Sequence, residues 1–277
     1  ILPPREPQEA LEVTMIHSMA GLLPENGLVQ HRPFRDPHHS ASLPALVGGG
    51  IRSRPGEVSL AHQGVLFLDE LPEFARSTLE ALRQPIEAGR VIVARANAHL
   101  TYPARVQVIA AMNPCRCGYF GEASRDCGRV PRCAQDYQMR LSGPLLDRFD
   151  IRLDVPSVSA KDLLGLPTGE SSQTIAARVA KARQIQKHRN RSSATGATVL
   201  NAALDGAIME KAVVLDDGGK DLLGRAMDCY KLSGRGYYRI LRVARTLADL
   251  ENVEKVEKEH IAEALNYRCS GTLLLGE

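Results

Sequence analysis

The most informative pattern is a run of four apolar residues, 65 to 68, that leads directly into Asp69 and Glu70. An unbroken apolar run of this length, bounded by Gly64 and Pro72, is typical of a strand buried on both faces of a parallel sheet. Ligands of α/β proteins bind beyond the carboxyl ends of such strands. The pattern therefore predicts two acids at the functional edge of a sheet, although a strand that ends at an acidic turn has the same pattern.

Patterns elsewhere predict a mixed first part and a helical second part. Apolar positions have helical spacing over residues 9–22 and 77–88, and residues 91–102 have the pattern of a hairpin. A second buried strand is expected at residues 106–112, and an edge strand with alternating apolar and charged positions at residues 151–155. From residue 174 onward the patterns are only helical, at residues 174–188, 205–215, 219–232, 235–250 and 259–265.

Composition marks the expected domain boundaries. Residues 24–58 are rich in Pro, Gly and His, which indicates an insertion or a long loop. Residues 157–191 have the composition of a linker followed by a basic helix. We therefore expect an α/β domain over residues 1–156 and a small all-helical domain over residues 192–277.

Composition and charge also narrow the class of protein. With 44% hydrophobic residues the chain can bury a substantial core, and its net charge of +3 permits nucleic-acid contact without demanding it. No apolar run approaches the length of a membrane span, and the first residues do not form a signal peptide. Six cysteines in 277 residues do not indicate a secreted disulfide scaffold. We therefore expect a cytoplasmic protein with reduced thiols and no membrane partner.

Four cysteines fall in one Gly- and Arg-rich loop between residues 114 and 136. They are Cys115, Cys117, Cys127 and Cys133, which is the number of thiolates that a tetrahedral Zn²⁺ site requires. The single residue between Cys115 and Cys117 is a tighter spacing than the usual two to about four residues. An iron–sulfur cluster and a set of reduced thiols beside the active site are the alternatives to a zinc site.

The acid pair and two other polar residues fit the chemistry of nucleotide hydrolysis. One acid of the pair can hold Mg²⁺ on a nucleotide, and its neighbour can orient and deprotonate a water molecule. Asn113 ends the second predicted strand, where it can orient water or contact a γ-phosphate, or belong to an ordinary Asn-Pro turn. Arg148 can stabilise phosphoryl-transfer charge across a subunit interface, or pair locally with Asp147 or Asp150.

A further arginine, Arg235, opens a predicted helix and could reach into a cleft between the two domains. Three arginines follow it on the same helix, Arg239, Arg242 and Arg245. We interpret these three as a solvated basic face.

The order of these features along the chain resembles that of the AAA+ ATPases. It comprises the acid pair, a helix, a hairpin, the strand that ends at Asn113, the sequence Leu-Asp-Arg-Phe-Asp around Arg148, and a helical part with Ser-Gly before Arg235. A hairpin before the second strand resembles the branch that holds the MCM helicases and the magnesium chelatase ATPase subunits. Residues 32–40, 64–74, 141–148 and 238–246 resemble still more closely the magnesium-chelatase-like proteins of the bacterial ComM/YifB family, and the resemblance covers nearly the whole chain.

This resemblance assigns expected roles to five residues. It implies that Asp69 is the Mg²⁺-associated Walker B acid, Glu70 the catalytic base and Asn113 the sensor 1 residue. It also implies that Arg148 is an arginine finger acting on a neighbouring subunit, and that Arg235 is the sensor 2 residue. ATP and Mg²⁺ are the implied ligands, with Asp69, Asn113 and Arg235 as their contacts.

The resemblance also implies self-association into a ring, expected to be a hexamer, with two segments facing its pore. These are the helix-2 insert at about residues 33–57 and the pre-sensor-1 hairpin at about residues 91–102. Arg95 and His99 at the hairpin tip are expected to contact the phosphates of a threaded DNA strand. His38 and His39 of the insert could also meet phosphates, join a metal site, or be solvated.

One motif of the family is absent. The chain has no Gly-x-x-x-x-Gly-Lys-Ser/Thr phosphate loop, and the glycine run at residues 48–50 lacks the lysine. In the family this loop lies immediately before the stretch that matches residues 1–4, so we expect the chain to begin just after it and to lack the amino-terminal Lon-protease-like domain. The sheet should then lack its first strand and have an unpaired edge. This chain alone is expected to bind ATP weakly and not to hydrolyse it.

The implied function is that of an ATP-hydrolysing ring motor that remodels DNA, as a branch-migration helicase does in DNA uptake and recombination. One alternative is an ATPase that remodels a protein partner, as magnesium chelatase subunits do. Another is a scaffold that binds nucleic acid without hydrolysis, and the intact acid pair argues against it. Residues 174–191 contain basic residues and no acid, so they could attract phosphates or form a solvated helix that packs against the core.

Overall fold

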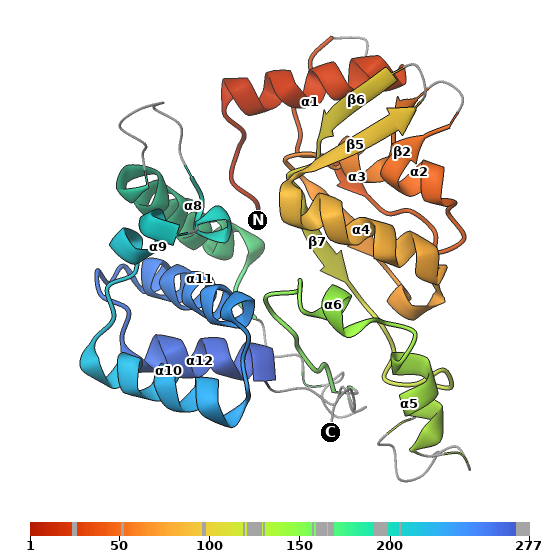
Figure 1. The fold of residues 1–277 in the computed structure, drawn as a ribbon. Coiled ribbons are helices and arrows are strands. Elements are labelled where there is room, and N and C mark those ends of the chain that lie inside the picture. Colours follow the sequence, from red (N-terminus) through yellow and green to blue (C-terminus); the bar gives the residue numbers. More distant parts are fainter. Residues whose placement is uncertain are drawn as a thin grey trace. The chain divides into compact units, whose positions relative to one another are not determined.

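A computed structural model describes residues 1–23, 27–50, 53–95, 98–118, 120, 129, 131–156, 158, 165, 169–190, 199–204 and 206–269 (Figure 1). The described residues form two compact units. One is Pro4–Arg148, and the other comprises the residues from Phe149 onward together with Ile1–Pro3. Within the described part of the chain, no helix combines the length and the apolar composition that a bilayer crossing needs.

The first unit is built on a parallel sheet with the strand order β1-β4-β7. Its strands are β1 (Phe34–Arg35), β4 (Val65–Leu68) and β7 (Gln107–Ala110). Leu66 of the central strand pairs with Arg35 on one side and Val108 on the other, and it is fully buried. Gly64 precedes this strand because a Cβ atom there would lie 2.0 Å from the carbonyl oxygen of Pro33. The predicted buried strand and the α/β class are therefore confirmed.

Among the described residues, the outer strands β1 and β7 each pair only with the central strand β4, so both edges of the sheet are open. Ile109 of β7 is correspondingly 41% exposed. The expected loss of the first strand of the sheet stays a prediction.

Helices and a hairpin surround the sheet. The helices are α1 (Pro7–Ala20), α2 (Leu43–Val47), α3 (Glu57–Leu60), α4 (Arg76–Ala88), α5 (Arg132–Gln138) and α6 (Gly143–Leu146). Helix α4 ends at Gly89, whose left-handed backbone (φ 63°) closes the last turn as glycine readily does. The predicted hairpin is confirmed as β5 (Arg90–Arg95) paired antiparallel with β6 (Ala98–Pro103), the two long strands side by side in Figure 1. Strands β2 (Gly48–Gly49) and β3 (Arg54–Pro55) form a second, short antiparallel pair.

The edge strand predicted at residues 151–155 is absent from the structure. These residues belong to no strand, and Leu153 and Val155 are 68% and 87% exposed. The backbone N–H of Arg152 instead donates to the carbonyl oxygen of Tyr267 in a helix (2.9 Å). The prediction was wrong because alternation of apolar and charged residues describes a strand only where a neighbouring strand can satisfy its backbone.

The second unit is helical, as predicted. Its helices are α8 (Ser172–Arg189), α9 (Gly206–Ala212), α10 (Asp217–Cys229), α11 (Gly234–Glu251) and α12 (Lys258–Cys269). Figure 1 shows α10, α11 and α12 packed side by side, and their apolar faces form the core of the unit. Ile240 and Ala244 of α11 and Ile261 of α12 are almost completely buried there. The exact domain boundaries at residues 156 and 191 stay a prediction.

A buried ionic network joins α8 to α11. The carboxylate of Asp249 is fully buried and accepts hydrogen bonds from Arg189 (2.6 and 2.8 Å) and from the amide of Asn201 (2.7 Å). Arg245 is also buried. Its Nε donates to Asp249 (3.1 Å), and its Nη1 and Nη2 donate to backbone carbonyl oxygens. Burial lowers the pKa of Arg245, and Asp249 partly opposes this change.

The solvated basic face predicted for Arg239, Arg242 and Arg245 of α11 is therefore wrong. Arg245 is a core residue, Arg239 pairs with Asp150 (2.6 Å), and Arg242 donates to the carbonyl oxygen of Leu204 (2.8 Å). The prediction was wrong because the spacing of charged residues on a helix does not show whether a buried carboxylate pairs with them.

Candidate functional site

The two acids of the predicted site lie at the carboxyl edge of the parallel sheet. Asp69 and Glu70 directly follow the buried strand β4, and both side chains are exposed. Two backbone hydrogen bonds with Ala111 tie the end of this strand to the end of β7: Ala111 donates to Leu68 and accepts from Leu71, each at 3.0 Å. The chain therefore fixes the acids beside the end of β7.

Asn113 lies at the same edge, two residues after Ala111, and is exposed. The parallel register of β4 with β7 brings the two strand ends together, and with them the predicted sensor and the acid pair. The structure thus groups three of the residues that the sequence assigns to the nucleotide site: Asp69, Glu70 and Asn113.

Glu70 has an unusual backbone conformation for a residue with a side chain. Its φ of 51° and ψ of 46° are left-handed, a conformation that is uncommon outside glycine and is often found at functional sites. Asp69 accepts a hydrogen bond from the backbone N–H of Glu70 (2.9 Å), which helps to hold this turn. The turn directs the chain from the strand into the 3₁₀ helix Leu71–Glu73.

His39 contacts the Glu70 carboxylate, with its Nδ1 atom 3.0 Å from Oε2. The ring of His39 also packs edge-on to Phe74 and against His38, at centroid distances of 6.4 and 4.1 Å. This contact was not predicted, because residues 24–58 were interpreted as an insertion or a long loop. Strand β1 runs parallel to β4, so the residues that follow β1 reach the same edge as Glu70.

Arg148 lies against helix α4 rather than beside the acids. Its Nη2 atom is 2.5 Å from the carboxylate of Glu87, and its Nε donates to the carbonyl oxygen of Arg83 (3.1 Å). A shallow pocket beside it is lined by side chains of α4, among them Glu80 and Gln84. Arg148 thus forms an ion pair with Glu87, a partner that is distant in sequence and differs from Asp147 and Asp150, which were considered from the sequence. The role of Arg148 as an arginine finger stays a prediction.

Arg235 belongs to the helical unit. It is exposed in the first turn of α11, whose N-cap residue Ser233 accepts a hydrogen bond from the backbone N–H of Gly236 (3.2 Å). The sensor 2 role of Arg235 stays a prediction.

Of the residues expected to contact DNA, His38 and His99 are exposed and His39 is half-buried. His99 lies on β6, close to the hairpin tip, whereas the side chain of Arg95 lies outside the described residues. His38 is engaged locally, with Nδ1 2.8 Å from the hydroxyl of Ser40. Contacts of these residues with phosphates stay a prediction.

The basic helix α8 contributes more to packing than its charge suggests. Ala182 and Gln186 are buried, Arg189 belongs to the Asp249 network, and Arg178 pairs with Glu170 (3.0 Å). These contacts favour the packing alternative over phosphate binding for this helix.

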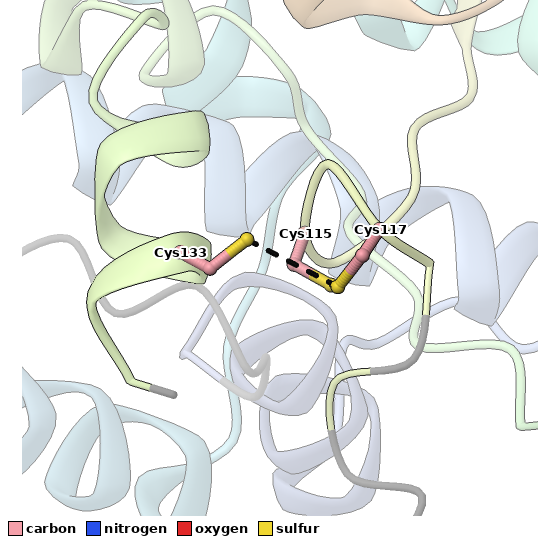
Figure 2. Close-up of side chains that lie close together, drawn as sticks. All are labelled: Cys115, Cys117 and Cys133. Carbon is pink, nitrogen blue, oxygen red and sulfur yellow. Dashed lines mark hydrogen bonds between the residues drawn. The ribbon is translucent and has the colours of Figure 1, made fainter. Parts of the chain in front are cut away.

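Three of the four loop cysteines lie together. The Sγ atoms of Cys115, Cys117 and Cys133 are all within 4.8 Å of one another, and Figure 2 shows Cys133 projecting from α5 toward the turn that carries the other two. Cys127, the fourth predicted ligand, lies outside the described residues.

Comparison with known proteins defines the family. The family model "Magnesium chelatase, subunit ChlI" matches residues 1–163, and "Magnesium chelatase, subunit ChlI C-terminal" matches residues 169–268. The chain therefore belongs to the magnesium-chelatase-like family, whose members are AAA+ ATPases.

Its relatives place it in the ComM/YifB group of that family. The chain is 44% identical to the uncharacterised protein YifB of Salmonella typhimurium over 277 residues, which is 99% of this chain and 53% of the relative. It is also 44% identical to the competence protein ComM of Haemophilus influenzae over 280 residues, 99% of this chain and 52% of that protein. The chain thus spans about half the length of the curated relatives it matches. A shorter similarity, 32% over 103 residues and 37% of this chain, links it to the zygotic DNA replication licensing factor mcm3 of Xenopus laevis, of which it covers 12%.

Proposed function

We propose that the full-length protein is a cytoplasmic ring ATPase, a hexamer, that hydrolyses Mg²⁺–ATP at its subunit interfaces to remodel DNA. The observation that carries this proposal is the placement of Asp69 and Glu70 after the buried central strand of a parallel sheet. Asn113 follows the neighbouring strand at the same edge. This edge is where α/β proteins bind nucleotides.

The side chains at this edge suit a magnesium nucleotide, because Mg²⁺ is bound in such sites by one or two carboxylates and by phosphate oxygens. The ion, when bound, neutralises charge on the β- and γ-phosphates. In the proposed mechanism Asp69 holds the ion and Glu70 accepts a proton from the attacking water. Asn113 orients that water or the γ-phosphate. The contact with His39 holds the Glu70 carboxylate at the edge of the sheet.

Two arginines complete the proposed mechanism. Arg148 of one subunit stabilises the charge that develops on the phosphates bound to the next subunit, a role that suits a planar and permanently charged group. Its guanidinium is bound to Glu87 in the structure, so assembly of the ring has to exchange this carboxylate for the neighbour's nucleotide. Arg235 contacts the nucleotide from the helical unit and couples hydrolysis to movement of that unit.

DNA is the proposed substrate because of the relatives. The chain is similar to a competence protein over nearly its whole length and to a DNA replication licensing factor over a part of it. Its hairpin presents His99 to solvent, and Arg95 is close to it in sequence. A protein partner is the second candidate, which the magnesium chelatase family model favours.

ATP turnover by the full-length protein should rise when branched DNA is added. A motor that moves along DNA hydrolyses ATP faster when its pore segments engage the strand, and phosphate contacts make the stimulation decrease as salt is added. The measurement is steady-state ATP hydrolysis with and without forked DNA over a range of salt concentrations. Turnover that is indifferent to DNA would contradict the DNA proposal and favour the protein partner.

A further inference from the structure

We propose that Cys115, Cys117 and Cys133 form a structural zinc site that fixes the segment between β7 and α5. The three Sγ atoms lie within 4.8 Å of one another although two of them are on a turn and the third is on a helix. All three thiols are free, and Cys115 is only 1% exposed. Clustered cysteine thiolates are preferred ligands of Zn²⁺.

The distances between the sulfur atoms fit tetrahedral zinc. With Zn–S bonds of about 2.3 Å, two sulfur ligands of one ion are separated by about 3.8 Å. In the structure Cys115 and Cys117 are 3.1 Å apart, Cys117 and Cys133 are 4.0 Å apart, and the third pair is no more than 4.8 Å apart, so shifts of about 1 Å or less bring the three sulfur atoms to the tetrahedral separation. Both exceed the length of a disulfide bond, which is about 2.05 Å.

Two hydrogen bonds hold the segments that carry the thiols in place without a metal, one within the backbone and one from a side-chain amide. The N–H of Gly118 donates to the carbonyl oxygen of Cys115 (3.1 Å), and the left-handed Gly118 (φ 81°) closes this turn around Cys117. On the other side, the amide of Gln138 donates to the carbonyl oxygen of Pro114 (3.0 Å) and fastens α5, which carries Cys133, to the same turn. The two bonds align the ligands before a metal binds, which reduces the entropy lost on binding.

The charges near the cysteines also suit a metal–thiolate site. Each thiol releases its proton as its S–Zn bond forms, so three thiolates and one Zn²⁺ carry one excess negative charge. Arg116 lies between Cys115 and Cys117, and Arg132 directly precedes Cys133. Either of these cations can balance the excess charge. The described residues supply three of the four donors of the proposed tetrahedron.

The proposed site would position the candidate nucleotide residues without taking part in their chemistry. Asn113 is two residues before Cys115 on the segment that leaves β7. A metal that holds this segment therefore fixes the backbone at the edge of the sheet, and its presence can be measured independently of ATP hydrolysis.

The test is the metal content of the full-length protein, purified without chelators and measured by mass spectrometry of the elements. We expect about one zinc ion per chain, lost in Cys115→Ser and Cys133→Ser and retained in Cys229→Ser. Cys229 is a matched control because it is a free, exposed thiol on α10, in the other compact unit. Zinc that is absent from the wild-type protein, or lost equally in Cys229→Ser, would overturn the proposal.

A second measurement covers the case in which the serine variants do not fold. The wild-type protein, stripped of metal under reducing conditions, should bind Co²⁺ with thiolate-to-cobalt charge-transfer bands and the visible bands of tetrahedral cobalt, and added Zn²⁺ should remove both. Failure to develop these bands would contradict the proposal. An intact mass that shows a disulfide between these cysteines, or iron with sulfide in the purified protein, would also contradict it.

Discussion

Replacing Glu70 by Gln in the full-length protein is expected to lower kcat for ATP hydrolysis by about 10²–10⁴-fold, the usual contribution of a general base. The amide has the shape of the carboxylate but cannot accept a proton from water. Glu70 lies at the end of a strand whose neighbours fix its backbone, so the substitution should leave the fold and ATP binding intact. The measurements are steady-state turnover and ATP affinity by titration calorimetry.

Glu73→Gln is the matched control. Glu73 lies in the 3₁₀ helix that follows Glu70, and its carboxylate pairs with Arg140 at 2.9 Å. This variant makes the same chemical change close by, and it should keep turnover close to that of the wild type. Equal losses in both variants, or full turnover in Glu70→Gln, would remove Glu70 as the base.

Replacing Asp249 by Ala is expected to destabilise the protein by about 3–5 kcal/mol, the typical cost of removing one partner from a buried ion pair. The carboxylate is completely buried and binds both Arg189 and Arg245. Its loss leaves two guanidinium groups beside a cavity, and the network with Asn201 loses its acceptor. Denaturant unfolding followed by circular dichroism measures the change.

Asp217→Ala serves as the comparison for this variant. Asp217 also carries an ion pair, with Lys220 at 3.0 Å, but its side chain is fully exposed. Its replacement should leave the unfolding midpoint close to that of the wild type. If both aspartate variants moved the midpoint equally, the buried network would not be what stabilises the helical unit.

The parts of the fold that could be predicted from sequence are those in which one short segment determines its own environment. The apolar run before Asp69 predicts a buried strand from its own residues alone. Gly89 ends helix α4 because glycine readily adopts the left-handed conformation. The order of such segments was specific enough to indicate the family. The positions of Glu70 and Asn113 at one edge then followed from parallel pairing.

The parts that could not be predicted depend on contacts between distant segments. Nothing in the local sequence shows that Arg245 pairs with a buried carboxylate, or that Arg148 pairs with Glu87 on helix α4. The same holds for His39, whose contact with Glu70 exists because β1 and β4 are neighbours in the sheet. Long-range pairing decides these positions, and one sequence does not contain a direct signal of it.

The central claim is that hydrolysis takes place between subunits, with Glu70 from one and Arg148 from the next. The most direct test mixes full-length Glu70→Gln and Arg148→Ala subunits, each inactive alone, and confirms by co-purification of two affinity tags that mixed rings form. Some interfaces of a mixed ring combine an intact Glu70 with an intact Arg148, so ATP turnover should reappear on mixing. Mixed rings that co-purify but remain inactive would contradict the account.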